Sequence, residues 1–169
     1  MVRVRRTKAP ETTPTRALRK HVELPALGWR EWVGLPDLAV DRIKAKVDTG
    51  ARSSALHAYN MHIYYRAGTP HVSFDVHPIQ RDVGTSIAAR AEVVAIRSVR
   101  SSSGQVELRP VISTHVAVGE HVWPIELTLT NRDEMGFRML LGRQAIRGRF
   151  LVDGGRSYLQ SRRRRGKLR

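Results

Sequence analysis

Residues 43–58 read Ile-Lys-Ala-Lys-Val-Asp-Thr-Gly-Ala-Arg-Ser-Ser-Ala-Leu-His-Ala. Ile43, Ala45 and Val47 alternate with lysines, which is the period-two pattern of a strand that buries one face. The strand runs directly into an Asp-Thr-Gly triplet that begins at Asp48 and occurs once in the chain. The stretch therefore predicts a half-buried strand that presents a carboxylate at its end.

The rest of the chain has the sequence pattern of an all-β domain, because short runs rich in Val, Ile, Leu and Thr alternate with residues that favour turns. Gly68 to Pro70 and Gly119-Glu120 are expected to turn hairpins, and Ser101 to Gly104 is expected to be a mobile hairpin tip. A short helix is expected to start at Gly142. With no internal repeat, the pattern predicts one small closed barrel. The expected strands are 62–65, 72–76, 90–96, 106–113, 116–118, 121–130 and 139–141.

Length and composition suit a soluble protein of one domain. The chain has 169 residues, 41% of them hydrophobic, and no cysteine. The absence of cysteine excludes disulfides and thiolate metal sites and fits a reducing compartment. No run approaches the roughly 20 apolar residues of a membrane span, and the N-terminus lacks a signal-peptide core. We therefore expect a cytoplasmic, unprocessed protein with no membrane contact.

The positive charge is concentrated at the two ends of the chain. Residues 1–20 and 161–169 each carry +6 of the total +15, which leaves +3 for the 140 residues between them. Both ends lack apolar periodicity, so we expect disordered basic tails at 1–22 and 161–169 around a folded domain at 23–160. Such tails can contact RNA or the ribosome through phosphate groups, or can simply keep the protein in solution.

The residue types of the Asp-Thr-Gly turn suit acid-base chemistry on a peptide bond. Two aspartates about 3 Å apart share one proton, so one can activate water while the other polarises a carbonyl. Gly50 permits a tight turn that brings an amide near the carboxylate, and the Thr49 hydroxyl can bond to a neighbouring turn. Asp48, Thr49 and Gly50 are therefore the candidate catalytic residues. Since each chain has one such turn, the chemistry requires a homodimer.

The order of motifs resembles that of retroviral-type aspartic peptidases, with Asp48 to Ala51 after a strand, a hairpin in mid-chain, and Leu140 to Arg143 near the end. A closer resemblance is to a bacterial family of RimK-associated, retropepsin-like proteins, which also carries the label ATP-dependent zinc protease. It implies an all-β, retropepsin-like (acid protease) barrel with a short C-terminal helix and aspartic peptidase activity. The matching segments are 28–36, 43–58, 106–112, 123–126 and 129–143, and one departure lies at 153–156.

The sequence supports neither the ATP dependence nor the zinc binding that the family label names. The chain has no Gly-rich loop followed by Lys-Ser or Lys-Thr and no His-Glu-x-x-His motif. Its seven histidines lack the short spacing of zinc ligands, which leaves only a metal site assembled from distant strands open. His57 is expected to be a packing or groove residue. We therefore expect no cofactor and no metal.

Several arginines indicate an acidic substrate. Arg52 occupies a position that is usually acidic in retroviral-type enzymes, and Arg143 would lie near it, with Asp133 or Glu134 as an alternative internal partner. A flap is expected at 97–109; a charged, solvated edge strand is the alternative. The resemblance also implies an acidic substrate, because members of the family occur together with RimK, a ligase that adds glutamates to a small-subunit ribosomal protein. The expected substrate-binding residues are Ala51, Arg52, Arg97, Arg100, Ser102, Gly104, Arg109 and Arg143.

The leading hypothesis is thus a homodimeric aspartic endopeptidase that acts on glutamate-rich peptides or protein tails. The alternative is an inactive module that binds acidic peptides or the ribosome and regulates the ligase. In that case Asp48 would be a structural turn residue.

Overall fold

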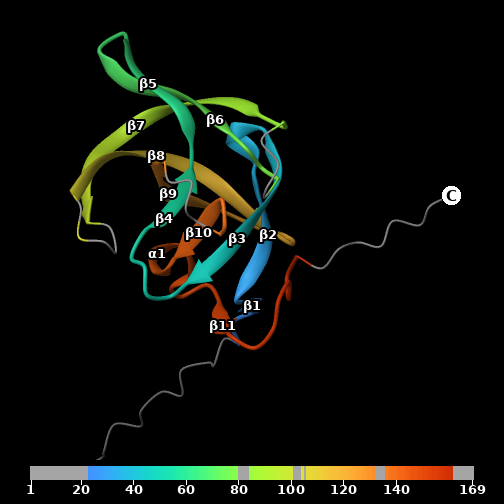
Figure 1. The fold of residues 1–169 in the computed structure, drawn as a ribbon. Helices are drawn as coiled ribbons and strands as arrows, with labels where there is room; N and C mark the ends of the chain where they lie inside the picture. The colour runs from blue at the N-terminus through green and yellow to red at the C-terminus, as the bar shows by residue number, and fades with distance from the viewer. Residues whose placement is uncertain (1–22, 80–83, 101–103, 105, 132–135, 162–169) are drawn as a thin grey trace, which may run out of the picture.

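The computed structural model of the protein describes residues 23–79, 84–100, 104, 106–131 and 136–161. Six strands form a closed barrel in the order β2-β3-β10-β4-β9-β8, and a pairing between Gly34 of β2 and Ala117 of β8 closes it (Figure 1). The expected all-β barrel is confirmed. The barrel strands are β2 (Arg30–Leu35), β3 (Val40–Asp48), β4 (Ser54–His57), β8 (Val106–Val118), β9 (His121–Thr130) and β10 (Met139–Gly142).

Two parallel pairings bring distant parts of the chain to the end of β3. β10 runs parallel to β3, with Gly142 beside Asp48. β4 runs parallel to β9 and antiparallel to β10, so it lies between them. A crossover is needed wherever neighbouring strands are parallel. As a result, the turn after Asp48 lies against the start of helix α1 (Arg143–Ile146), which follows β10.

Beyond β8 the sheet continues outward through three further strands. These are β7 (Ile87–Arg100), β6 (Thr69–Val76) and β5 (Tyr59–Arg66), and the β5–β6 hairpin projects away from the barrel in Figure 1. At the opposite side β1 (Ala26–Gly28) pairs in parallel with β11 (Leu151–Asp153). A short 3-10 helix, η1 (Pro36–Leu38), connects β2 to β3.

The hydrophobic core confirms the alternation expected for β3. Ile43, Ala45 and Val47 are between 0% and 6% exposed, while the lysines between them point outward. They pack in one cluster with side chains such as Leu127 and Leu141 from the neighbouring strands. Burial of these apolar side chains is the main force that places the end of β3.

Of the two predicted hairpin turns, one is confirmed and the other lies slightly earlier in the sequence than expected. Gly119 and Glu120 do connect β8 to β9, and Gly119 has a φ of +61°. The β5–β6 turn, expected at Gly68 to Pro70, instead consists of Ala67 and Gly68, with φ values of +49° and +81°. This two-residue turn has positive φ at both central residues, a conformation that Pro70 cannot adopt. The gap expected between 113 and 116 is also wrong, because β8 is continuous.

A buried carboxylate ties the C-terminal segment to the barrel. Glu31 on β2 is fully buried, and its Oε1 accepts hydrogen bonds from the backbone N–H groups of Gly28 at 2.8 Å, Leu159 at 2.8 Å and Gln160 at 3.3 Å. Its Oε2 accepts from the backbone N–H of Ser161 at 3.1 Å and from the Ser161 hydroxyl. One side chain therefore joins the two ends of the described chain.

Within the described ranges, no helix has both the length and the apolar composition needed to cross a lipid bilayer. The tails expected at 1–22 and 161–169 lie outside the described residues except for Ser161, whose backbone N–H bonds to Glu31. The tip residues 101–103 lie outside them as well.

Candidate active site

Asp48 lies half-buried at the end of β3, and the turn that follows it folds back onto its carboxylate. Oδ1 of Asp48 accepts hydrogen bonds from the backbone N–H groups of Gly50 at 3.0 Å and of Ala51 at 3.1 Å. Bonds from N–H donors to a charged acceptor are stronger than neutral ones and orient it. One oxygen of the carboxylate is thus anchored by its own turn.

The start of helix α1 holds this turn in place. The backbone N–H groups of Arg143 and Gln144 donate to the carbonyls of Ala51 at 2.8 Å and Arg52 at 3.0 Å. The Arg143 guanidinium donates to the carbonyl of Thr49 at 2.9 Å. Arg143, expected to meet substrate, therefore also supports the turn from its own chain. The geometry explains why a Gly-Arg pair accompanies an Asp-Thr-Gly turn far away in sequence.

Gly142 is the point of closest approach between the two segments, and Gly142→Ala is expected to destabilise the fold. A Cβ at this position would lie 2.3 Å from the carbonyl oxygen of Ser53, which belongs to the backbone and cannot rotate away. We expect a loss of about 3 kcal/mol in the free energy of unfolding, typical of overpacking. Urea unfolding measures it. Gly154→Ala is the control, because nothing lies within 4 Å of a Cβ there. Equal stability of both variants would contradict this packing.

A groove of about 370 Å³ separates the turn after Asp48 from the long β7 strand. Its walls come from the turn (Arg52 and Ser53), from α1 (Gln144) and from the residues 97–100 of β7. The structure thus brings together Arg52, Arg97 and Arg100, three of the arginines that the sequence marks as substrate-binding. The hairpin β7–β8 has the position expected of a flap, with Arg97 opposite Arg109.

Two of the four groove and flap arginines have acidic partners within the chain. Arg97 pairs with Glu126 at 2.6 Å, and the hydrogen bond to this carboxylate raises the pKa of the Arg97 guanidinium above its usual value. Arg109 pairs with Glu107 at 2.9 Å, and its side chain is only 7% exposed. Arg52 and Arg100 form no ion pair with another described residue. They are the groove cations that remain available to a ligand.

The other expected site residues lie at the edges of the groove or outside the described chain. Gly104 is exposed with a φ of +84°, which suits a hairpin tip. Ser102, Asp133 and Glu134 fall outside the described residues, so their expected contacts stay predictions. His57 is 1% exposed and packs edge-on against the ring of Tyr59 at 4.2 Å between ring centres, as expected of a packing residue.

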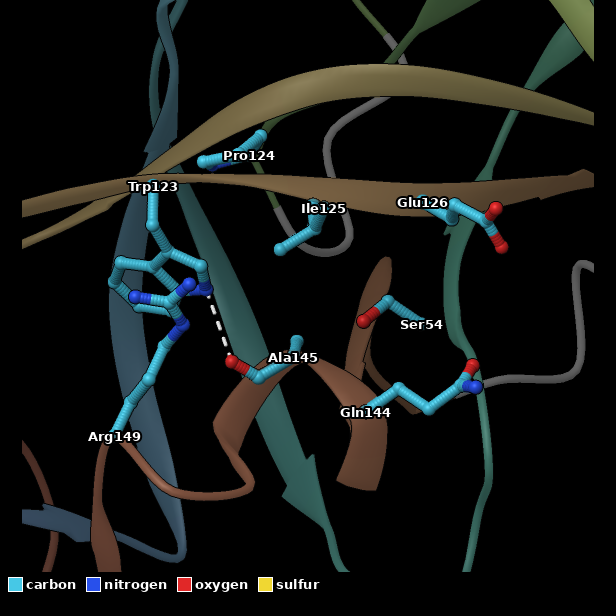
Figure 2. Close-up of a pocket in the computed structure, with 8 residues that line it drawn as sticks. All are labelled: Ser54, Trp123, Pro124, Ile125, Glu126, Gln144, Ala145 and Arg149. Carbon is cyan, nitrogen blue, oxygen red and sulfur yellow. Dashed lines mark hydrogen bonds between the residues drawn. The ribbon is translucent and has the colours of Figure 1, made fainter.

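A second hollow of about 270 Å³ adjoins the groove and shares Gln144 with it. Figure 2 shows Trp123 and Ala145 at one end of this hollow and Glu126 and Gln144 at the other. The indole N–H of Trp123 donates to the Ala145 carbonyl at 2.9 Å, which fixes the end of α1.

A pocket of about 430 Å³ on the other side of Asp48 was not expected from the sequence. Besides Asp48 it is lined by Trp29, Lys46, Phe137 and Leu140, with Gly136 at its edge. The rings of Trp29 and Phe137 meet edge to face at 5.9 Å between centres. The alternation of β3 could have identified Lys46, which shares a face with Asp48. The β10 side of the pocket could not be found this way, because it depends on the pairing of β3 with β10.

No group of three or more His, Asp or Glu side chains among the described residues is placed to hold a metal ion. The site presents a hydrogen-bonded carboxylate between a basic groove and a pocket lined in part by aromatic and apolar side chains.

Comparison with known proteins identifies the family. Residues 26–163 match the model of the RimB-like family, described as the retropepsin-like aspartic endopeptidase RimB. The fold is similar to the crystal structure of a Legionella pneumophila protein of unknown function, with a TM-score of 0.69 and 28% sequence identity over 81% of this chain and 98% of that one.

Longer proteins contain a similar segment. The chain is 46% identical over 132 residues to a probable alpha-L-glutamate ligase of Shewanella halifaxensis, and 50% identical over 127 residues to one of Parasynechococcus marenigrum. The matches cover 78% and 75% of this chain but only 29% and 27% of those ligases. The motif, the barrel and the family model agree, so the chain belongs to the RimB-like family of retropepsin-like aspartic endopeptidases.

Proposed function

We propose that this chain is an aspartic endopeptidase that works as a homodimer on acidic, glutamate-rich peptide segments. The observation that carries the proposal is the anchored Asp48 carboxylate beside a groove where Arg52 and Arg100 form no ion pair with any residue that the structure describes. An unpaired guanidinium in a groove favours a carboxylate ligand, since it can donate two parallel hydrogen bonds to it.

In the proposed mechanism the two Asp48 carboxyl groups of a dimer share one proton and hold a water molecule between them. The ionised carboxylate takes a proton from the water as its oxygen attacks the scissile carbonyl carbon. The protonated carboxyl group donates its proton to the carbonyl oxygen. Collapse of the resulting diol breaks the C–N bond, and the leaving nitrogen takes up a proton, which yields a new carboxyl end and a new amine end.

The relatives suggest where an acidic substrate comes from. In them a segment similar to this chain is part of a much longer protein named a glutamate ligase. We propose that this chain acts on a protein tail that such a ligase has extended with glutamate, including the tail of a ribosomal protein. The peptidase would then limit or remove the extension.

The direct test is cleavage of matched peptides by the purified protein. We expect a peptide that contains a run of glutamates to be cut, and its glutamine counterpart to be cut at least about 10-fold more slowly because the charge contacts are lost. Mass spectrometry identifies the products, and analytical ultracentrifugation reports the dimer. Equal cleavage of both peptides would reject the proposed preference for acidic substrates. No cleavage of either peptide would reject the proposed peptidase activity.

The alternative is a module that binds acidic peptides without cleaving them. It is favoured by one observation, which is that the motif supplies a single catalytic carboxylate per chain. A strictly monomeric protein that binds the glutamate peptide and does not cut it would establish this function instead.

A further inference from the structure

The outer face of the β2–β3 ladder carries a row of cations that the catalytic groove does not use. Arg42, Lys44 and Lys46 alternate along β3, so all three point to the same face as Asp48. On β2 the residue opposite Lys46 is Arg30. Residues two apart on a strand lie about 6.6 Å from each other, so the row extends about 20 Å from Asp48 to Arg42.

Aromatic rings hold three of these cations, Arg30, Arg42 and Lys44, in position. The guanidinium of Arg42 lies 4.1 Å from the ring centre of Trp32, and the ammonium of Lys44 lies 5.1 Å from it. Arg30 lies over the rings of Trp29 at 4.5 Å and Tyr158 at 5.2 Å. Cation–π contacts restrict long side chains, which lowers the entropy that a ligand must overcome. These three side chains are therefore held in place before anything binds.

Among the described residues, the four cations of the row have no acidic partner. Arg30, Arg42, Lys44 and Lys46 form no ion pair with any other described residue, although Asp41 lines the same hollows as Arg42. Two arginines of the flap differ, since Arg97 and Arg109 are paired, whereas Arg100 is not paired with any described residue. The uncompensated positive charge on this face attracts anions.

The row leads into the candidate active site. Lys46 and Trp29 line the same pocket as Asp48, and Lys44 and Arg42 continue from there along β3. A chain bound with one residue at Asp48 could therefore continue over the row without leaving the surface.

We propose that Arg30, Arg42, Lys44 and Lys46 form a second anion-binding site that holds an acidic peptide beyond the scissile bond. The choice of an acidic peptide as the ligand of this site rests on the proposed function. An extended peptide presents same-face side chains about 7 Å apart, which matches the spacing of the cations. One face of Trp32 stacks with Tyr158 at 6.1 Å, and cations lie over the ring as well. This leaves little ring surface on which nucleic acid bases could stack. The row therefore recognises its ligand by charge, which favours an acidic peptide over single-stranded RNA.

The experiment measures binding without turnover, in protein that carries Asp48→Asn. The probes are fluorescent peptides with four or about twelve glutamates, which extend about 14 Å and 40 Å. Arg42→Gln combined with Lys44→Gln should weaken binding of the longer peptide roughly fivefold and leave that of the shorter one unchanged, because from Asp48 only the longer one reaches Arg42 and Lys44. The charge-preserving pair Arg42→Lys and Lys44→Arg should restore binding and excludes misfolding as the cause.

The matched control is Arg66→Gln combined with Arg90→Gln, which removes the same charge from exposed positions on β5 and β7. Equal loss in the control, or no loss in the Arg42 and Lys44 variant, would overturn the proposal. Loss of oligouridylate binding with unchanged peptide binding would also overturn it and assign the row to RNA. Cleavage by the unmodified protein is measured separately, so absence of cleavage with intact row-dependent binding would reject the peptidase and keep the site.

Discussion

Replacing Asp48 with Asn is expected to lower the rate of peptide cleavage by on the order of 10⁴-fold, as loss of an essential group does in other hydrolases. The amide oxygen of Asn can still accept the hydrogen bonds from Gly50 and Ala51, so the turn should keep its shape. It cannot take a proton from water, because an amide is a very weak base. Product formation by mass spectrometry measures the rate, and circular dichroism and sedimentation should match the unmodified protein.

Glu92→Gln is the control for Asp48→Asn. It removes one negative charge from an exposed position of β7 and should leave cleavage within about twofold of the unmodified protein. Full peptidase activity in the Asp48→Asn variant would reject the catalytic assignment. Loss of the dimer in that variant would instead show that Asp48 has a structural role.

Mixing the two proteins tests whether each site needs two Asp48 residues. If subunits exchange and mixed dimers are inactive, an equal mixture should retain about a quarter of the activity of the unmodified protein at the same total concentration. Retention of one half would indicate that each chain acts alone. This result does not depend on knowing the natural substrate.

Replacing Glu31 with Ala is expected to cost about 3 kcal/mol of stability, because the donors that it satisfies lose their buried acceptor. The variant should lower the urea midpoint of unfolding, followed by tryptophan fluorescence. Because Leu159 to Ser161 bond to this carboxylate, the C-terminal segment should also become more sensitive to limited proteolysis. Glu31→Gln should be destabilised too, since its NH₂ group would face N–H donors.

Glu120→Ala serves as the control for Glu31. Glu120 is exposed in the turn between β8 and β9, where removal of a side chain changes stability by less than about 0.5 kcal/mol. A Glu31→Ala protein that unfolds at the same urea concentration as Glu120→Ala would show that the carboxylate does not hold the segment.

Local patterns in the sequence were sufficient for most of the strands and for the candidate carboxylate. They did not identify the strands β1, β2, β4 and β11. The alternation of Ile43, Ala45 and Val47 identified β3 and placed Asp48 at its end, because one-sided burial imposes a period of two on a strand. Gly119-Glu120 identified a hairpin because a two-residue turn needs positive φ. The β5–β6 turn was displaced because both Gly68 and Pro70 are turn formers, and only pairing of the flanking strands selects between registers.

The residues around the carboxylate depended on tertiary structure. Leu140 meets Lys46 only because β10 runs parallel to β3, and Glu31 meets Leu159 across 128 positions of the chain. The sequence by itself determined an all-β barrel with one Asp-Thr-Gly turn, since burial and turn geometry act between near neighbours. Only the tertiary structure decided which arginines are paired and which cations lead to Asp48, because ion pairs join side chains from strands that are far apart in sequence.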